Sequence, residues 1–274
     1  MDGIMGRDIS YSYEGEGGDA PALSQVELSI PRGSFVAILG HNGCGKSTLV
    51  RLLNALLPLQ EGALSVGGIP VDDPTRRRAL RRSCGMVFQN PENQFVSSLV
   101  EEEVAFGLKN YDWPPAEIPG QVAAALALVG LSGYEKRAPN SLSGGEKQRL
   151  ALAGVLAMEP EFIVFDEATS MLDPEGRWAL LNTMEALHRK GKTIVMITHY
   201  VEEAVAADRV YLMQAGRILA AGSPREILTD RALLEQAGLL PPMAAELYYD
   251  LAEAGLLSGP CPLTKEELVE ALCR

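Results

Sequence analysis

One eight-residue segment constrains this chain more than any other. Residues 40–47 read GHNGCGKS and match the pattern G-x-x-x-x-G-K-[ST], with the apolar run SFVAILG before it and the helical GKSTLVRLLNALL after it. Glycines in such a loop let successive backbone N–H groups face phosphate oxygens without interference from a Cβ atom. The helix that follows directs the positive end of its dipole at the same anion. The segment therefore predicts a phosphate-binding unit of strand, loop and helix.

This loop supplies most of the expected nucleotide contacts. Lys46 is expected to reach the β- and γ-phosphates, and Ser47 to bind Mg²⁺ through its hydroxyl. The expected cofactor-binding residues of the loop are Gly40, His41, Asn42, Gly43, Cys44, Gly45, Lys46, Ser47 and Thr48. Lys46 and the helix start should lower the pKa of the Cys44 thiol, so we expect its alkylation to be blocked by ATP. The loop alone leaves kinases, GTPases and other ATPases open.

The pattern of apolar runs predicts an α/β fold with a mixed sheet. FIVFD at 162–166 and KTIVMIT at 192–198 indicate buried parallel strands separated by a helix. The N-terminal third, with DISYSY and ALSQVELSIPRG, indicates an antiparallel β part. The stretch between these regions is helical in pattern, so we expect an inserted helical subdomain at about residues 90–158.

The chain is expected to divide into a core of residues 1–229 and a small helical extension of residues 230–274. Ser223 and Glu226 form a capping-box pattern at the last core helix, and Thr264 and Glu267 repeat it inside the extension. Leu263 and Leu268 are placed as a hydrophobic staple for that second helix. The extension is a candidate dimerisation segment.

Composition excludes several function classes. The formal net charge is −12, which disfavours binding to nucleic acid through phosphate neutralisation and direct adhesion to an anionic membrane surface. No targeting segment is evident, and no apolar run approaches the ~18 residues that a membrane span needs. The 4 cysteines show no CxxC spacing, which argues against disulfides or a zinc site. We expect a cytoplasmic protein that reaches a membrane only through a protein partner.

Two further segments carry chemistry. Asp166 and Glu167 end a buried strand, where open α/β sheets bind ligands, so Asp166 is expected to hold Mg²⁺ and Glu167 to deprotonate the attacking water. The alternative is an acidic pair that only compensates a helix dipole. LSGGE at 142–146 combines a capping box with two glycines that expose first-turn N–H groups. It is either a simple cap or a second anion site.

With LSGGE, the sequence closely resembles the ATP-binding-cassette (ABC) ATPases over about residues 4–226. The resemblance implies a P-loop NTPase core in which the signature of one subunit covers the γ-phosphate held by its partner. It assigns Gln89 to the metal and the attacking water, His199 to the γ-phosphate, and Tyr13, or Tyr11 by a register slip, to stacking on adenine. The residues expected to act on the partner's ATP are Ser143, Gly144, Gly145 and Asp173. His188 and the side chain of His41 are expected to have no role.

The segment FQNPENQFVSSLVEEEVAFGLKN further resembles the ATPase subunits of energy-coupling-factor (ECF) transporters, which import vitamins and transition-metal ions. That resemblance implies a second ATPase subunit, identical or related, a transmembrane scaffold and a substrate-binding membrane protein, at the cytoplasmic face of the cell membrane. Residues 90–107 are expected to line the groove for the scaffold, with Phe95, Val96 and Phe106 as apolar contacts or, alternatively, as core residues. Glu101, Glu102 and Glu103 are expected to be a solvated helix start.

Three other interpretations were weighed. An ATPase of another ABC importer, for an amino acid or a metal chelate, would share every catalytic motif. A DNA-maintenance ABC ATPase would need a long coiled coil between Ser47 and Ser143, and no sustained heptads occur there. A translation-associated or regulatory ATPase would usually carry two cassettes in one chain. The transported substrate cannot be read from this sequence.

Overall fold

The computed structural model describes residues 3–13, 21–91 and 95–273. Its central element is a six-stranded sheet in which five strands run parallel and the edge strand β10 runs antiparallel to β9. Across the sheet the strands are β10 (Arg217–Gly222), β9 (Arg209–Gln214), β3 (Phe35–Leu39), β8 (Thr193–Thr198), β7 (Phe162–Asp166) and β6 (Cys84–Val87). The predicted strands at 162–166 and 192–198 are confirmed as β7 and β8, with β8 starting one residue later.

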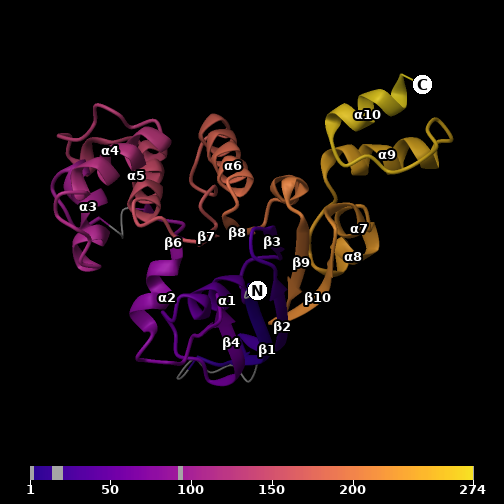
Figure 1. The fold of residues 1–274 in the computed structure, drawn as a ribbon. Helices are drawn as coiled ribbons and strands as arrows, with labels where there is room; N and C mark the ends of the chain where they lie inside the picture. The colour runs from indigo at the N-terminus through magenta and orange to yellow at the C-terminus, as the bar shows by residue number, and fades with distance from the viewer. Residues whose placement is uncertain (1–2, 14–20, 92–94, 274) are drawn as a thin grey trace.

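A second, antiparallel sheet packs below the first (Figure 1). Its strands, in order, are β2 (Leu23–Ile30), β1 (Ile4–Tyr11), β4 (Glu61–Val66) and β5 (Ile69–Pro70). Buried and exposed residues nearly alternate along β2, because one face of the sheet covers the core and the other meets solvent. The prediction of a mixed fold with an antiparallel N-terminal part is confirmed.

Helices pack around the two sheets or project from them (Figure 1). They are α1 (Lys46–Leu53), α2 (Arg77–Ser83), α3 (Val100–Asn110), α4 (Ile118–Leu128), α5 (Gly144–Leu156), α6 (Pro174–Arg189), α7 (Pro224–Leu228), α8 (Arg231–Gln236), α9 (Met243–Glu253) and α10 (Lys265–Leu272), with short 3-10 helices η2 (Pro139–Ser141) and η3 (Val201–Ala206). The helix expected over GKSTLVRLLNALL, residues 45–57, is shorter in the structure. Leu49, Leu52 and Leu53 are buried, but the helix ends at Leu53 and Leu56 is exposed.

Two hydrophobic cores meet across the central sheet. In β3, Phe35, Ala37 and Leu39 belong to the core shared with α3 to α6, whereas Val36 and Ile38 belong to the core shared with α1 and the antiparallel sheet. This division follows from the two-residue side-chain period of a strand. Because both faces are covered, β3 is buried at every position, and the loop after it has a rigid support.

Helices α3, α4 and α5 pack against one another beyond β6, at the upper left of Figure 1. Val100, Val104 and Leu108 of α3 form one face of this packing and are fully buried. The same core continues under the sheet, so α5 is held in a defined position relative to β6 and β7. This group of helices coincides with the stretch expected to form an inserted subdomain.

The C-terminal helices differ in how they pack. Ser223 and Glu226 form a reciprocal capping box at α7, as predicted. At α10 the Thr264 side chain accepts from the N–H of Glu267, but the Glu267 carboxylate accepts from the N–H of Leu263 instead, so that box is not reciprocal. Leu234 of α8 is buried in the main core, whereas α9 and α10 project from the molecule at the upper right of Figure 1.

No helix in the described ranges is both long enough and apolar enough to span a membrane.

Candidate functional site

The loop between β3 and α1 has the backbone that its glycines predict. Gly43 and Gly45 have φ of 81° and 106°, in the left-handed region that favours glycine. A Cβ atom at Gly45 would lie 2.5 Å from the carbonyl oxygen of Ala22, and one at Gly40 would lie 2.5 Å from that of Met213. Neighbouring strands therefore enclose the loop so closely that larger residues do not fit at these two positions.

Lys46 is held in place by the loop that precedes it. Its side chain is buried, and Nζ donates hydrogen bonds to the carbonyl oxygens of Gly40 at 2.8 Å and His41 at 3.0 Å. Glu167 Oε1 lies 3.5 Å from the same nitrogen. A buried ammonium group needs such partners, because an isolated charge away from water is costly. The contacts hold a positive charge next to the loop's N–H groups.

Ser47 and Asp166 come together as predicted. The Ser47 hydroxyl donates to Asp166 Oδ1 at 2.8 Å, although 119 residues separate them in the sequence. Burial raises the pKa of the Asp166 carboxyl, and the hydrogen bond from Ser47 opposes that rise. A hydroxyl and a carboxylate side by side are hard oxygen ligands, the type that Mg²⁺ prefers. The donor set fits a magnesium ion that also binds phosphate oxygens.

Glu167 lies between a cation and a histidine. Besides its contact with Lys46, its Oε2 is 3.7 Å from Nδ1 of His199. Its backbone has a φ of 50°, which is uncommon for a residue with a Cβ, and its N–H donates to the carbonyl oxygen of Ile197 on β8. The neighbouring strand thus imposes the strained conformation that directs Glu167 toward the loop.

His199 is placed for an interaction that the chain itself does not supply. Its Nδ1 is buried and has no hydrogen-bond partner within the described part of the protein. Its ring packs against that of Tyr200, with centroids 4.1 Å apart. Unpaired buried polar atoms are rare in folded proteins and often mark functional sites.

Tyr13, and not Tyr11, has the exposure that stacking on a base requires. Tyr13 is 46% exposed, and its hydroxyl lies 3.1 Å from Oγ1 of Thr48 at the start of α1, whereas Tyr11 is 6% exposed within β1. Their rings meet edge to face, with centroids 5.0 Å apart. The buried ring of Tyr11 therefore supports the exposed one beside the phosphate loop.

Gln89 makes no hydrogen bond or ion pair with the other catalytic candidates in the described part of the chain. Its side chain is exposed and has no hydrogen-bond partner among the described residues. A residue not expected from the sequence anchors the backbone just before Gln89. Gln148 of α5 is buried and donates from Nε2 to the carbonyl oxygen of Phe88 at 3.2 Å. In the sequence, Gln148 lies four residues before Leu152 and therefore on the same side of the predicted helix, and this spacing could have indicated that Gln148 is buried.

The signature segment starts α5 as predicted. Ser143 and Glu146 form a reciprocal capping box. A Cβ added to Gly144 or Gly145 would meet no atom of the chain within 4 Å, so the packing of this subunit does not require glycine at either position. Both glycines face a hollow of about 450 Å³ that Asp173 and Met171 also line.

Asp173 lies at the far side of that hollow and begins α6. Its carboxylate accepts the N–H of Gly176 at 2.8 Å as a helix cap. None of residues 40–48, all of which are described, lines this hollow. The signature and Asp173 therefore form one surface, and the phosphate loop lies on another.

The segment after Gln89 is only partly accessible. Residues 92–94, within the stretch expected to line a groove, lie outside the described residues. Val96 and Phe106 are 64% and 45% exposed, whereas Phe95 packs against the main core. Phe95 is partly buried, which favours the core alternative for this residue, whereas Val96 and Phe106 keep the exposure that a docking contact needs.

The three glutamates of α3 make contacts within the chain. Glu103 accepts hydrogen bonds from the N–H groups of Val96 and Ser97 at 2.9 and 2.8 Å. Glu101 pairs with Lys136, and Glu102 accepts a long hydrogen bond from Ser98. All three lie in the first turn of the helix, where the dipole favours negative charge. They act as a helix start that also holds the exposed segment before it.

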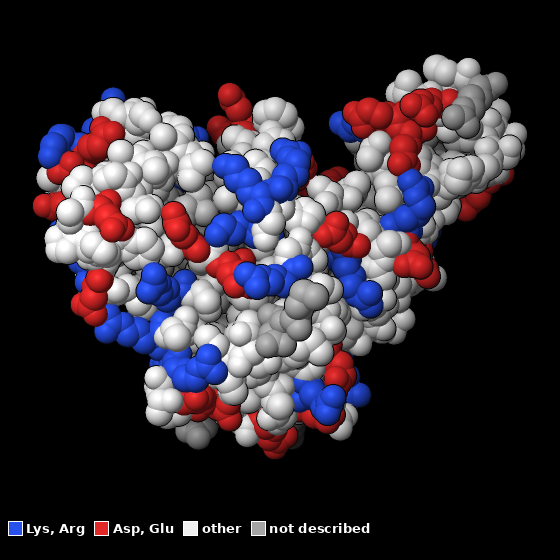
Figure 2. Space-filling model, in the orientation of Figure 1, with Lys and Arg blue, Asp and Glu red and all other residues white. Residues whose placement is uncertain are grey.

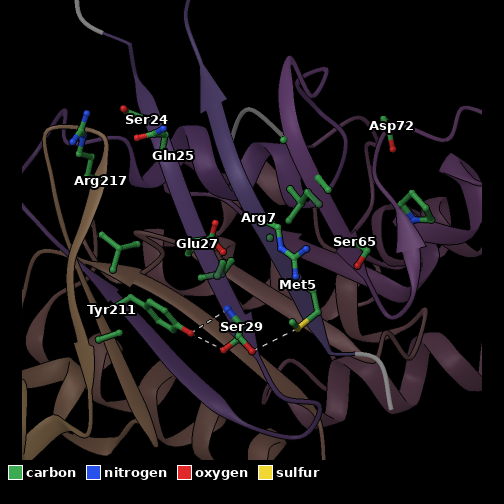
Figure 3. Close-up of a pocket in the computed structure, with 18 of the residues that line it drawn as sticks. Met5, Arg7, Ser24, Gln25, Glu27, Ser29, Ser65, Asp72, Tyr211 and Arg217 are labelled. Carbon is green, nitrogen blue, oxygen red and sulfur yellow. Dashed lines mark hydrogen bonds between the residues drawn. The ribbon is translucent and has the colours of Figure 1, made fainter.

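A larger hollow, of about 780 Å³, lies away from the phosphate loop (Figure 3). Its walls are the outer face of β1, β2 and β4 and the β9–β10 hairpin. At its edge the Tyr211 hydroxyl donates to the carbonyl oxygen of Ser29 at 2.6 Å and accepts its N–H at 3.2 Å. These bonds connect the two sheets, and we assign this hollow no chemistry.

Neither of the other histidines nor the surface charge adds a second site. His188 Nε2 lies 3.2 Å from Asp208 Oδ2, and the exposed ring of His41 contacts the carbonyl oxygen of Asn42 through Nδ1. On the face seen in Figure 2, Lys and Arg are interspersed with Asp and Glu. That pattern gives no continuous basic surface on this face for nucleic acid.

The expectation for Cys44 was wrong. Its side chain is 1% exposed, and burial raises the pKa of the thiol, an effect that outweighs the lowering by Lys46 and by the nearby backbone N–H groups. The thiol packs under the loop, within the core beneath α1. The sequence shows that Lys46 lies close to Cys44, but it does not show that the Cys44 thiol is removed from water.

Comparisons with known proteins agree with this geometry. A family model described as "ABC transporter" matches residues 23–170. The energy-coupling factor transporter ATP-binding protein EcfA1 of Clostridium novyi is 47% identical over 98% of this chain and 96% of its own length. The corresponding EcfA protein of Methanosarcina acetivorans is 46% identical over 97% of this chain and 96% of its own.

Solved structures give the same result. CbiO1 of Clostridium perfringens, part of the ABC transporter complex CbiONQ, superimposes with a TM-score of 0.76 at 33% identity, covering 87% of this chain and 95% of that one. The ATP-binding cassette MJ0796, solved as a dimer bound to ADP and phosphate, gives 0.74 at 27% identity, covering 81% and 98%.

The environment of Cys44 predicts slow alkylation. The thiolate is the reacting species, so a raised pKa lowers the reactive fraction near neutral pH and burial limits access further. With iodoacetamide, Cys44 should react more slowly than the exposed Cys273, because burial both raises the pKa of the Cys44 thiol and limits access of the reagent. Peptide mass spectrometry measures both rates, and the urea-unfolded chain, in which both should react alike, is the control. Fast labelling of Cys44 in the folded protein, suppressed by ATP, would contradict this prediction.

Proposed function

Because the chain belongs to the ABC transporter family and, within it, to the energy-coupling factor transporter ATP-binding proteins, we propose that it powers the uptake of a vitamin or a transition-metal ion. It binds ATP and hydrolyses it, and ATP-driven closure of a pair of such subunits supplies the motion. One observation carries this proposal. The chain has a complete phosphate loop and, on a separate surface, a signature helix whose two glycines face open space.

The pair is proposed to form two composite sites. In each, the loop of one subunit holds the phosphates, and Ser143, Gly144, Gly145 and Asp173 of the other cover the γ-phosphate. Exposed N–H groups at the start of α5 suit an anion, as does the dipole of a helix of 13 residues. Removal of the γ-phosphate takes away the group that bridges the subunits, so the pair reopens.

Within one site, the residues of this chain are given the following roles. Lys46 neutralises phosphate charge, and Tyr13 stacks on the adenine. Glu167 takes the proton of the attacking water, and His199 donates from its ring to the γ-phosphate. Mg²⁺, held by Ser47 and Asp166 and proposed to be reached by Gln89, supplies charge neutralisation when bound.

The proposed partners are a second ATPase subunit, identical or related, a transmembrane scaffold and a substrate-binding membrane protein. This places the chain at the cytoplasmic face of the cell membrane through protein contacts. Val96 and Phe106 support a docking surface for the scaffold, because both are exposed in the part of the sequence that follows Gln89, and because Glu103 accepts a hydrogen bond from the backbone of Val96. Between Ser47 and Ser143 the longest described helices have 11 residues, which leaves no coiled coil of a DNA-maintenance ATPase there.

The projecting helices α9 and α10 are proposed to strengthen subunit pairing. Exposed apolar side chains on these helices are Met243 and Leu247 of α9 and Val269 and Leu272 of α10, and Leu256 is exposed in the connection between them. A second ATPase subunit is the proposed occupant, since it would bring an identical or related apolar surface. The proposed segment begins after α8, because Leu234 of α8 belongs to the main core. Deletion from residue 230 would therefore test folding as well as pairing.

The role of Glu167 is tested by Glu167→Gln. The amide keeps the shape but cannot accept the proton, so turnover should fall at least about 10²-fold, in line with general-base contributions. ATP binding should persist, and the closed dimer should accumulate with ATP on size-exclusion chromatography. Glu185→Gln, on the outer part of α6, is the matched control. ATPase activity near that of the unsubstituted protein would reject the role of Glu167.

The docking surface is tested by Val96→Asp combined with Phe106→Asp. A charge at these exposed positions should abolish co-purification with membrane proteins while the ATPase rate of the isolated subunit stays within about twofold, since surface substitutions have small effects on stability. Leu128→Asp, at a position of α4 that is 52% exposed, is the matched control. If the double variant still assembles fully, the surface is not the docking site.

The pairing role of α9 and α10 is tested by Leu247→Glu combined with Val269→Glu. Both residues are exposed, so the fold should be retained, and the dissociation constant of the dimer should rise at least about tenfold by analytical ultracentrifugation. Met5→Glu, at an exposed position of β1, serves as control. An unchanged dissociation constant of the dimer would refute the proposed pairing role of α9 and α10.

A further inference from the structure

A buried carboxylate lies behind the catalytic residues and has no assigned role. Glu203 of η3 is 4% exposed. Its Oε2 accepts hydrogen bonds from Oγ1 of Thr198 at 2.6 Å and from Oγ1 of Thr169 at 3.0 Å. Both threonines are themselves buried. A carboxylate removed from water in this way requires hydrogen-bond partners, and the two threonine hydroxyls supply them for Oε2.

The two threonines connect Glu203 to both catalytic segments. Thr198 is the last residue of β8 and directly precedes His199, and its hydroxyl oxygen also accepts the N–H of Tyr200 at 3.0 Å. The backbone on both sides of His199 is therefore fixed through Thr198. Thr169 lies two residues after Glu167, in the loop that leads to Asp173.

The other oxygen of Glu203 faces α6. Nε of Arg177 lies 3.6 Å from Glu203 Oε1, and neither atom has a hydrogen-bond partner among the described residues. The Arg177 guanidinium also lies 4.0 Å from the centre of the Tyr200 ring, whose other neighbour is the ring of His199. Arg177 thus reaches the histidine segment in two ways, through a charge pair and through an aromatic ring.

Arg177 belongs to the first turn of α6. Its N–H donates to the carbonyl oxygen of Asp173 at 2.9 Å, so its backbone is continuous with the residue that caps this helix. Arg177 therefore lies between Asp173, to which its backbone is hydrogen-bonded, and the side chains of Glu203 and Tyr200.

Stability alone does not account for this arrangement. Burial raises the pKa of the Glu203 carboxyl, and the hydroxyls of Thr198 and Thr169 and the charge of Arg177 oppose that rise. Replacing a buried ion pair by apolar residues of similar volume is often neutral or stabilising. A carboxylate with one oxygen fully bonded and the other facing an arginine at 3.6 Å is a poor way to fill a core.

We infer that Glu203 is a positioning residue that holds His199, the loop after Glu167 and the first turn of α6 as one unit. Through Arg177, the contact of Asp173 with the partner subunit is coupled to the position of His199 at the γ-phosphate of its own subunit. The inference rests on the proposed function, because it assumes that His199 acts at the phosphate and that Asp173 faces the partner.

The first test compares Glu203→Ala with Glu203→Gln. The alanine variant loses every contact, so kcat should fall about 10²-fold, the effect of a small misplacement of catalytic groups. The affinity of the monomer for ATP, measured by calorimetry, should stay within about threefold, because the phosphate loop is not touched. In the glutamine variant the amide oxygen can still accept from both threonines, so the urea midpoint should remain near that of the parent protein while kcat falls about tenfold.

Glu202 provides the matched control, since it is the adjacent glutamate and is exposed. Glu202→Ala and Glu202→Gln should leave kcat unchanged. A merely structural role for Glu203 predicts that kcat follows the folded fraction and that Glu203→Gln, with an unchanged urea midpoint, has full activity. That result would overturn the inference.

The second test is a double-mutant cycle with Arg177→Met. If both residues act through one contact, Arg177→Met should lower kcat about as much as Glu203→Gln, and the double variant should be no slower than either. ATP-driven dimerisation, measured in the Glu167→Gln background, should weaken in the same non-additive way. Additive losses would overturn the coupling.

His199→Ala separates failure of this inference from failure of the proposed function. A fully active His199→Ala variant would refute the assumed role of the histidine and with it the basis of both. An inactive His199→Ala variant together with fully active Glu203 variants would refute only the role of Glu203.

Discussion

The hydrogen bond between Ser47 and Asp166 connects the two halves of the catalytic apparatus. It joins the first turn of α1 to the end of β7 at 2.8 Å, and Lys46 and Glu167, the next residues on either side, lie 3.5 Å apart. This meeting is possible because β3, β8 and β7 are adjacent and parallel, so their carboxyl ends share one edge. Both cores support that edge. The closely enclosed glycines and the strained backbone of Glu167 can persist only on such a rigid base.

The same fold keeps the other functional surface apart from this edge. The signature begins α5 and Asp173 begins α6, and both helices pack on the far core with α3 and α4. In one subunit the start of α5 faces a hollow and not the phosphate loop. A helix start with two unobstructed glycines is suited to an anion. Within the proposed function this separation is what makes ATP the link between two subunits, and Glu203 with Arg177 would couple the two surfaces inside each one.

Much of the fold and site could be predicted from the sequence, and the misses have specific physical reasons. Strands such as β7 and β8, and helix caps such as Ser143 with Glu146, depend on residues close in sequence, so short sequence patterns predict them. Cys44 was misjudged because its charged neighbour is visible in sequence, whereas the core that desolvates its thiol comes from distant strands. Phe95 and Phe106 look alike in sequence, yet Phe95 is partly buried against the core and Phe106 is exposed. Gln148 and Glu203 were overlooked because their partners, Phe88 and Arg177, lie 60 and 26 residues away.

From the sequence, phosphate binding followed from the glycine loop with Lys46, whereas the family followed from the resemblance of LSGGE and of the segment after Val87 to the ABC and energy-coupling-factor ATPases. The sequence also determined which segments would be strands and which would be helices. Only the tertiary structure decided that Tyr13 and not Tyr11 is exposed beside the loop, that Glu167 contacts both Lys46 and His199, and that the signature glycines face away from their own phosphate loop. These facts depend on which surfaces the packed sheets and helices cover, and burial is a property of the whole fold rather than of any segment.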